Sequence, residues 1–179
     1  NKTKAVVIVH FGGKISKNIF LIKKFLKEKN IFLIEDAAHA LGSSHKKIKA
    51  GNIGDISAFS FYSTKIITTG EGGMITTNNI KLAQKCIQFR SRGAKLNSKN
   101  EIYNSLGTNH RLTDLQGLLG IFQLKRLRKF ISHRKNIAII YNKTFNQLAQ
   151  KNIICLPKID KESVSSFWRY IVILNKNIN

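Results

Sequence analysis

The chain has 179 residues, of which 42% are hydrophobic, and its formal net charge is +22. This length fits one domain of ordinary size, and the apolar content is sufficient for a packed core, which excludes intrinsic disorder. No run of about 18 apolar residues occurs, so no membrane-crossing helix is expected. The chain begins without Met and without a signal-peptide pattern, so we expect it to be part of a longer cytoplasmic protein.

The basic excess leaves a nucleic-acid partner open, although the pattern does not favour one. Lysine and arginine number 31, whereas aspartate and glutamate number only 9. The basic residues are scattered, and their densest run, at 125–129, lacks the interleaved aromatic residues of single-strand binders. An anionic substrate or a further part of the protein would also balance this charge. Nucleic-acid binding is therefore kept only as an alternative function.

The two cysteines, Cys86 and Cys155, do not have metal-ligand spacing. We expect them to be buried free thiols in a reducing cytoplasm, although a disulfide between them is left open.

The first part of the chain predicts a βαβ unit. Apolar runs at 5–9 and 31–34 indicate two buried strands, and helical periodicity at 16–28 places a helix between them. Such a unit pairs its strands in parallel. Two further strands are expected at 56–61 and 73–77, on either side of a glycine-rich loop.

The rest of the chain is predicted to be more helical. We expect a helix at 79–92 capped by Asn78 or Asn79, a long polar loop at 91–108, and a long helix at 112–148 with a break near 132–133. A strand is expected at 167–174. We therefore divide the chain into part of a large α/β domain at 1–130, and a connecting helix with the start of a small domain at 131–179.

Asp36 and Lys65 are the first pair of residues that indicate chemistry. Asp36 ends a predicted strand, and Lys65 lies in the loop after the next strand. Ligands of open α/β sheets bind at such strand ends. A deprotonated lysine can form a Schiff base with a carbonyl, and a carboxylate can pair with a protonated pyridine nitrogen. The pair predicts a pyridoxal-phosphate site, although Asp36 alone would equally suit a helix cap or a turn.

His39 and Ser60 extend this candidate site. His39 follows Asp36 by three residues and could face the same side, where it would bond the ring oxygen or the Asp36 carboxylate. Ser60 ends a predicted strand and could bind the cofactor phosphate, helped by Thr64, Thr68, Thr69 and nearby glycine N–H groups. The alternative is structural, with His39 a packing residue and Ser60 a satisfied core hydroxyl.

Several segments together resemble the sugar aminotransferases of the DegT/DnrJ/EryC1/StrS family. They are EDAAHALG at 35–42, the Gly54-Asp55 pair, SFYSTK at 60–65, TGEGG at 69–73, GTNHRLTDLQ at 107–116, Gln123-Leu124, HFGG at 10–13 and SFWRY at 166–170. The resemblance covers nearly the whole chain in order, with Phe and Gly in HFGG where the family usually has Leu-Tyr-Gly. The family's chains are about twice as long.

This resemblance implies an α/β fold-type I transferase. It comprises a partial large domain, with a mixed but mostly parallel sheet and flanking helices, and the start of a small C-terminal domain. It implies that Lys65 carries pyridoxal 5'-phosphate and shuttles protons, that Asp36 pairs with the pyridine nitrogen, and that His39 lies beside the ring. Ser60 is implied as a phosphate ligand. Asn109 is implied as a phosphate ligand given across the interface of a homodimer with shared active sites.

The implied reaction transfers an amino group, from glutamate by family likeness, to a nucleotide-linked keto-sugar. Some relatives are dehydratases with His in place of the lysine, so Lys65 favours the aminotransferase. A truncated or non-catalytic cofactor-binding member stays open beside the nucleic-acid alternative. The sequence does not identify the sugar, the aminated ring position or the nucleotide.

Overall fold

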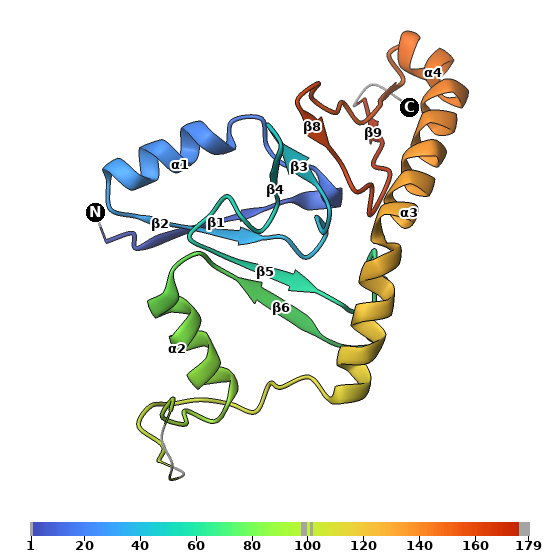
Figure 1. Cartoon of the computed structure of the whole chain (residues 1–179). Coiled ribbons are helices and arrows are strands. Elements are labelled where there is room, and N and C mark those ends of the chain that lie inside the picture. The colour runs from blue at the N-terminus through green and yellow to red at the C-terminus, as the bar shows by residue number, and fades with distance from the viewer. Residues whose placement is uncertain (1, 98–99, 101, 176–179) are drawn as a thin grey trace.

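A computed structural model describes residues 2–97, 100 and 102–175. A four-stranded sheet in the order β1-β2-β5-β6 organises the first half of the chain (Figure 1). Its strands are β1 (Ala5–Val9), β2 (Phe32–Asp36), β5 (Ile56–Ser60) and β6 (Gly73–Thr76). The first three are parallel, and β6 is antiparallel to β5. The predicted mixed, mostly parallel sheet is therefore confirmed.

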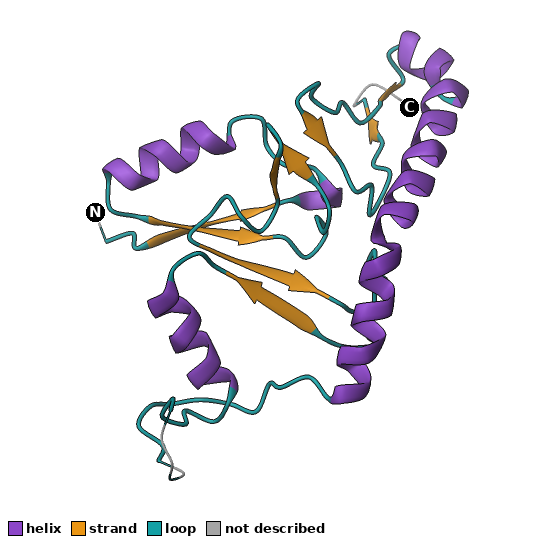
Figure 2. Cartoon of the chain, viewed as in Figure 1, coloured by secondary structure: helices purple, strands orange, loops and turns teal. Residues whose placement is uncertain are grey.

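Helices flank this sheet (Figure 2). α1 (Ile19–Glu28) and α2 (Ile80–Arg90) lie beside it, and α3 (Asp114–Thr144) runs past the ends of its strands. The short α4 (Asn146–Gln150) follows at the far end of α3, and a 3-10 turn η1 (Phe11–Gly13) follows β1. Asn79 caps α2 by accepting hydrogen bonds from the N–H groups of Lys81 and Leu82. The sequence alone leaves Asn78 and Asn79 both open as this cap. Thr113 and Gln116 form a capping box at the start of α3, which fixes where the long helix begins.

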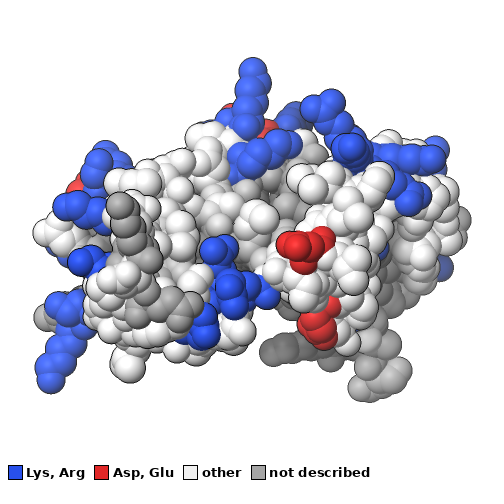
Figure 3. All heavy atoms as spheres, turned by 60° about the horizontal axis from the view of Figure 1, so that its bottom comes forward, with Lys and Arg blue, Asp and Glu red and all other residues white. Residues whose placement is uncertain are grey.

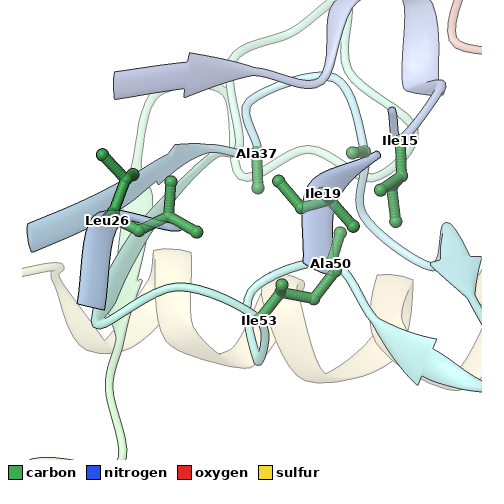
Figure 4. Packing of buried hydrophobic residues seen from close by; sticks show 8 residues of the cluster. Ile15, Ile19, Leu26, Ala37, Ala50 and Ile53 are labelled. Carbon is green, nitrogen blue, oxygen red and sulfur yellow. The ribbon is translucent and has the colours of Figure 1, made fainter. Parts of the chain in front are cut away.

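The hydrophobic core lies between α1 and one face of the sheet (Figure 4). Its buried side chains come from α1, from β2 and from the loops beside them: Ile15, Ile19, Leu26, Leu33, Ala37, Ala40, Ala50 and Ile53. On the other face Val7 is 59% exposed and Val9 is 51% exposed. The prediction that 5–9 is a fully buried strand is wrong, because within the described residues α1 covers the face opposite to these two side chains.

Three short pairings complete the fold. A small sheet joins β3 (Ser44–His45) to β4 (Ile48–Lys49) and to β8 (Ser163–Val164), and β7 (Ile154–Cys155) pairs with β9 (Ile173–Leu174). The β3–β8 pairing connects the last segment of the chain to the segment that follows β2. Both cysteines are free as predicted, but Cys86 is half-buried and Cys155 is exposed, so the prediction of buried thiols is wrong.

Two predictions in the second half also need correction. The long helix has no break near 132–133, since α3 is continuous to Thr144 and a new helix starts at Asn146. Only Ile173–Leu174 of the predicted strand at 167–174 is a strand. In the segment before it, the carbonyls of Phe167 and Trp168 accept from the Arg134 side chain on α3 instead of pairing with a strand. The division into domains at residue 130 stays a prediction, and α3 runs through that point. No described helix is long and apolar enough to span a bilayer.

Candidate active site

The parallel strands bring two predicted site residues, Asp36 and Ser60, to one edge of the sheet. In Figure 1 β1, β2 and β5 point toward α3. Val9 is in register with Asp36, and Asp36 with Ala58, two residues before Ser60. Asp36 therefore ends its strand beside the ends of both neighbours, with Ser60 at the end of one of them. This edge, at the carboxyl ends of parallel strands, is where open α/β sheets bind ligands.

The Asp36 carboxylate is half-buried and only partly used by the protein. Its Oδ1 accepts the N–H of Ala38 at 3.0 Å, which starts the turn after β2. Among the described residues it forms no ion pair within 4 Å. The other oxygen is therefore available for a cationic or N–H group of a ligand.

Lys65 lies in a loop that is closed by backbone hydrogen bonds. Phe61 N donates to Gly72 O at 2.8 Å, and Thr69 N donates to Phe61 O at 3.0 Å, so the two ends of the loop are held together. The half-buried Lys65 Nζ lies 4.7 Å from the centre of the Trp168 ring. Burial and the Arg169 guanidinium lower the pKa of Lys65, and the Asp36 carboxylate partly opposes them. A larger fraction of Nζ is therefore the neutral, nucleophilic amine.

His39 forms a stacked pair with Trp168. The two ring centres are 3.6 Å apart and the rings are inclined by 10°, while Phe11 contacts the imidazole edge-on. Burial and the Lys65 charge lower the pKa of His39, so the imidazole is neutral near pH 7. Its buried Nδ1 has no hydrogen-bond partner in the described part of the chain. This nitrogen can therefore form a hydrogen bond with a ligand at the site.

The predicted hydroxyl ligands differ in their availability. Ser60 is half-buried at the end of β5, and its Oγ accepts the N–H of Tyr62 at 3.3 Å. Thr68 Oγ1 donates to Phe61 O, and Thr69 Oγ1 donates to Glu71 O. These two threonines shape the loop around Lys65, so of the expected hydroxyls Ser60 is better placed for a ligand than Thr68 or Thr69.

Asn109 lies apart from this group. It is exposed, its Oδ1 accepts Arg111 Nε at 3.1 Å, and its backbone bridges to Ser91. None of these contacts involves Asp36, His39 or Lys65. The structure therefore brings four of the five predicted residues to one region and leaves Asn109 outside it.

Trp168 and Arg169 are site residues that the sequence did not assign. Trp168 Nε1 donates to Thr64 O at 2.9 Å, and Arg134 Nη1 lies 3.3 Å from the carbonyl oxygens of Phe167 and Trp168. The Arg169 guanidinium carbon lies 4.5 Å from the centre of the Trp168 ring. Trp168 is the only tryptophan of the chain. That rarity, and the resemblance of SFWRY to a family segment, were the available signals.

Hydrogen bonds hold the segment just before Trp168 against the turns that follow β1 and β2. Gly13 O accepts the hydroxyls of Ser43 and Ser165, and Ser166 Oγ donates to His39 O at 2.9 Å. Gly13 has a φ of +91°, and a Cβ there would collide with Ser166 Oγ. A glycine at this turn is therefore needed for the distant segment to close over the strand ends.

A large hollow of the described structure lies elsewhere. It has a volume of about 1110 Å³, lies between β6, α2 and residues 110–112, and is mainly apolar. None of the five predicted site residues lines it. The strand-end site is preferred because it combines a lysine, a carboxylate and an imidazole with perturbed pKa values at Lys65 and His39.

Comparison with known proteins decides the family. Residues 1–179 match the DegT/DnrJ/EryC1/StrS aminotransferase family. The chain belongs to this family. A relative within it, GDP-perosamine synthase of Escherichia coli O157:H7, is 38% identical over 168 residues, which cover 94% of this chain and 44% of that protein.

Solved structures of aminotransferases have the same fold as this chain. The aminotransferase from Psychrobacter cryohalolentis has a TM-score of 0.92 and 30% identity, covering 98% of this chain and 48% of that one. The sugar aminotransferase Spr1654 from Streptococcus pneumoniae, described as putative and solved in its PLP form, has a TM-score of 0.84 and 26% identity, covering 98% and 49%. These similarities confirm the predicted fold class. The chain spans about half the length of these two proteins and of GDP-perosamine synthase.

The donor set at the strand ends fits pyridoxal phosphate. The cofactor needs a primary amine for its aldehyde, a carboxylate for its ring nitrogen and polar groups for its other oxygens. Lys65 Nζ, the unused Asp36 oxygen and the unpartnered His39 Nδ1 supply groups of these kinds.

Proposed function

We propose that the protein is a pyridoxal-phosphate-dependent aminotransferase that moves an amino group from glutamate to a nucleotide-linked keto-sugar. The observation that carries this proposal is the gathering of Lys65, Asp36 and His39 at the strand ends, with Lys65 in no ion pair within the described chain. The family, and a relative named for GDP-perosamine synthesis, support a nucleotide-sugar substrate.

Four residues of this chain would hold the cofactor. Lys65 would attach it covalently, Asp36 would bind its ring nitrogen, and Ser60 would bind its phosphate. His39 would lie beside the ring, where its neutral Nδ1 can donate or accept according to its tautomer. The bound cofactor supplies an electron sink for charge that develops at the substrate carbon.

Lys65 also has the properties of a proton carrier. Its lowered pKa means that Nζ can accept a proton from the substrate carbon and, as the ammonium, return it. The Asp36 carboxylate stabilises the ammonium, whereas burial and Arg169 favour the amine. This opposition keeps both protonation states accessible.

We further propose a homodimer in which Asn109 serves the partner's site. Asn109 is exposed and makes none of its contacts with the site residues of its own chain. Beside it, the start of α3 carries exposed apolar side chains: Leu115, Leu118, Ile121 and Phe122. Such a patch is typical of a protein interface.

The charge distribution gives no specific support to the nucleic-acid alternative. Figure 3 shows basic side chains at several separate places on one face of the molecule, with acidic side chains between some of them. A duplex or single-strand binder usually gathers its basic residues into one patch or stripe.

The replacement Asp36→Asn tests the function and the role of the carboxylate together. Wild-type protein with pyridoxal phosphate should form 2-oxoglutarate from glutamate continuously only when a nucleotide-linked keto-sugar is present. Asp36→Asn should still bind cofactor but lower kcat by about 100-fold or more, because an amide cannot stabilise the protonated ring nitrogen. Oxoglutarate release and cofactor absorbance measure the two effects.

Asp55→Asn is not a suitable control, because Asp55 Oδ2 accepts the N–H of Leu33. Asp160→Asn in the C-terminal segment is preferred, because Asp160 Oδ1 accepts the N–H of Glu162 within its own turn, whereas the Asp55 bond joins the loop before β5 to β2. Near-normal turnover of Asp36→Asn would contradict its role. Cofactor binding by the wild type without any turnover would instead indicate a non-catalytic family member.

Mixed dimers test the shared site. Lys65→Ala and Asn109→Ala homodimers should each be impaired, the second mainly in cofactor affinity. Dimers formed randomly from both subunits should recover about a quarter of the wild-type activity, because half are mixed and each mixed dimer has one intact site. Activity and cofactor retention after subunit exchange are the measurements. No recovery would mean that Asn109 acts within its own chain.

A further inference from the structure

Arg169 is held close to the candidate catalytic lysine. Its guanidinium lies 4.5 Å, and Lys65 Nζ 4.7 Å, from the centre of the same Trp168 ring. Arg169 is exposed and forms no ion pair with any acidic residue of the described chain. Two cationic side chains thus lie close to one aromatic ring. No carboxylate of the described chain pairs with Arg169 to offset the repulsion between the two charges.

Contacts on several sides fix the position of the Trp168 indole ring. Its ring stacks on His39, its Nε1 is bonded to Thr64, and its carbonyl is near Arg134. An arginine stacked on a fixed ring loses less freedom when it binds an anion. Stacking also uses the face of the guanidinium and leaves the N–H donors in its plane for a carboxylate or a phosphate.

The short distance from Lys65 distinguishes between these two anions. In an amino acid a carboxylate is attached directly to the carbon that loses the amino group. In a nucleotide-linked sugar the diphosphate is separated from the reacting carbon by atoms of the sugar ring. Arg169 and the reacting Lys65 lie over the same ring, so an anion bound by Arg169 must be close to the reacting carbon. The carboxylate of an amino acid meets this condition better than the diphosphate of a nucleotide sugar.

We propose that Arg169, stacked on Trp168, is a specificity-determining residue that binds the carboxylate of the amino donor. This inference rests on the proposed aminotransferase function and deepens it, because it states what selects the donor. It also gives the single tryptophan a role, as the support that orients the arginine.

The test is a titration of the full protein, with its cofactor bound, with glutarate, a dicarboxylate that has no amino group to react. Trp168 fluorescence and the heat of binding are followed together, and Trp168→Phe identifies the part of the signal that comes from this ring. Wild-type protein should give a saturable change. Arg169→Gln should raise the apparent Kd by about 10- to 100-fold, because a charge-assisted hydrogen bond is lost. Arg169→Lys should recover part of the affinity.

Arg126→Gln is the matched control, since the Arg126 guanidinium is 5.0 Å from the centre of the Phe130 ring on α3. Its glutarate affinity should equal that of the wild type. An unchanged affinity in Arg169→Gln, or binding of inorganic pyrophosphate in place of glutarate, would overturn the inference. Cofactor absorbance separates this result from failure of the proposed function, in which the wild type would bind no pyridoxal phosphate.

Discussion

Replacing Lys65 with alanine is expected to abolish covalent attachment of pyridoxal phosphate and to lower amino transfer by at least about 10⁴-fold, at the upper end of what a single acid-base residue contributes. The effect should be large because Lys65 Nζ has two proposed roles: it bonds covalently to the cofactor, and it transfers the proton. Burial lowers the pKa of Lys65 in its loop, which favours the nucleophilic form of this amine.

The decisive measurement for this prediction is chemical rather than kinetic. Borohydride reduction of the wild type should fix the cofactor to the peptide that contains residue 65, as identified by mass spectrometry, and Lys65→Ala should carry no label. Lys65→Arg keeps the positive charge without a nucleophilic amine and should fail equally. Lys46→Ala, which removes an exposed lysine paired with Glu162, should behave as the wild type. A label on another lysine would reject the assignment.

The elements around the site could be predicted from sequence because their determinants are local. The apolar runs and the helix between them specify the βαβ unit, and Asn79 and Thr113 cap helices through donors two or three residues away. Parallel pairing then brings Asp36 and the end of β5 to one edge without further information. The strand pattern alone places Asp36 and Ser60 near strand ends. The family motifs then indicate which part of a cofactor each of them would bind.

Long-range contacts explain what could not be predicted. The hydrogen bond from Trp168 to Thr64 joins positions 104 residues apart, and no periodicity in either segment indicates it. The same cause accounts for the wrong strand at 167–174. Its hydrophobic and aromatic residues predicted strand pairing, whereas the carbonyls of Phe167 and Trp168 accept from the Arg134 side chain on α3, and the Trp168 side chain bonds to Thr64. The exposure of Val7 and Val9 is likewise a property of what covers the sheet and not of the strand itself.

Glu35 is the other residue whose importance only the structure reveals. It is fully buried, and its Oε1 accepts Ile53 N, Gly54 N and Ser57 Oγ at 2.6–2.8 Å. Its Oε2 accepts Gly51 N at 3.0 Å and His10 Nε2 at 2.8 Å. One carboxylate thus joins β1, β2, β5 and the loop before β5, immediately next to Asp36.

Glu35→Gln is expected to lower the free energy of unfolding by about 3–5 kcal/mol, as loss of one member of a buried charged network typically does. Glutamine keeps one acceptor oxygen but presents an N–H₂ donor on its other side. If this group faces Gly51 and His10, Gly51 N loses its acceptor, and His10 keeps a bond only by changing its tautomer. Urea denaturation measures the change. Glu162→Gln removes an exposed acid 3.6 Å from Lys46 and should cost no more than about 1 kcal/mol.

The pH dependence distinguishes this carboxylate from a general packing defect. Burial alone would raise the pKa of Glu35, but the hydrogen bonds from His10, Gly54, Gly51 and Ser57 outweigh burial and lower it from 4.5 to about 2. Because the folded pKa lies below the unfolded value, this stabilisation is complete above about pH 4.5 and is lost as the pH falls toward 2. The wild type should therefore lose stability steeply across that interval, whereas Glu35→Gln, already less stable, should show a shallower slope there. Equal slopes in the two proteins would show that Glu35 is not the group that links folding to acid, even if its replacement is destabilising.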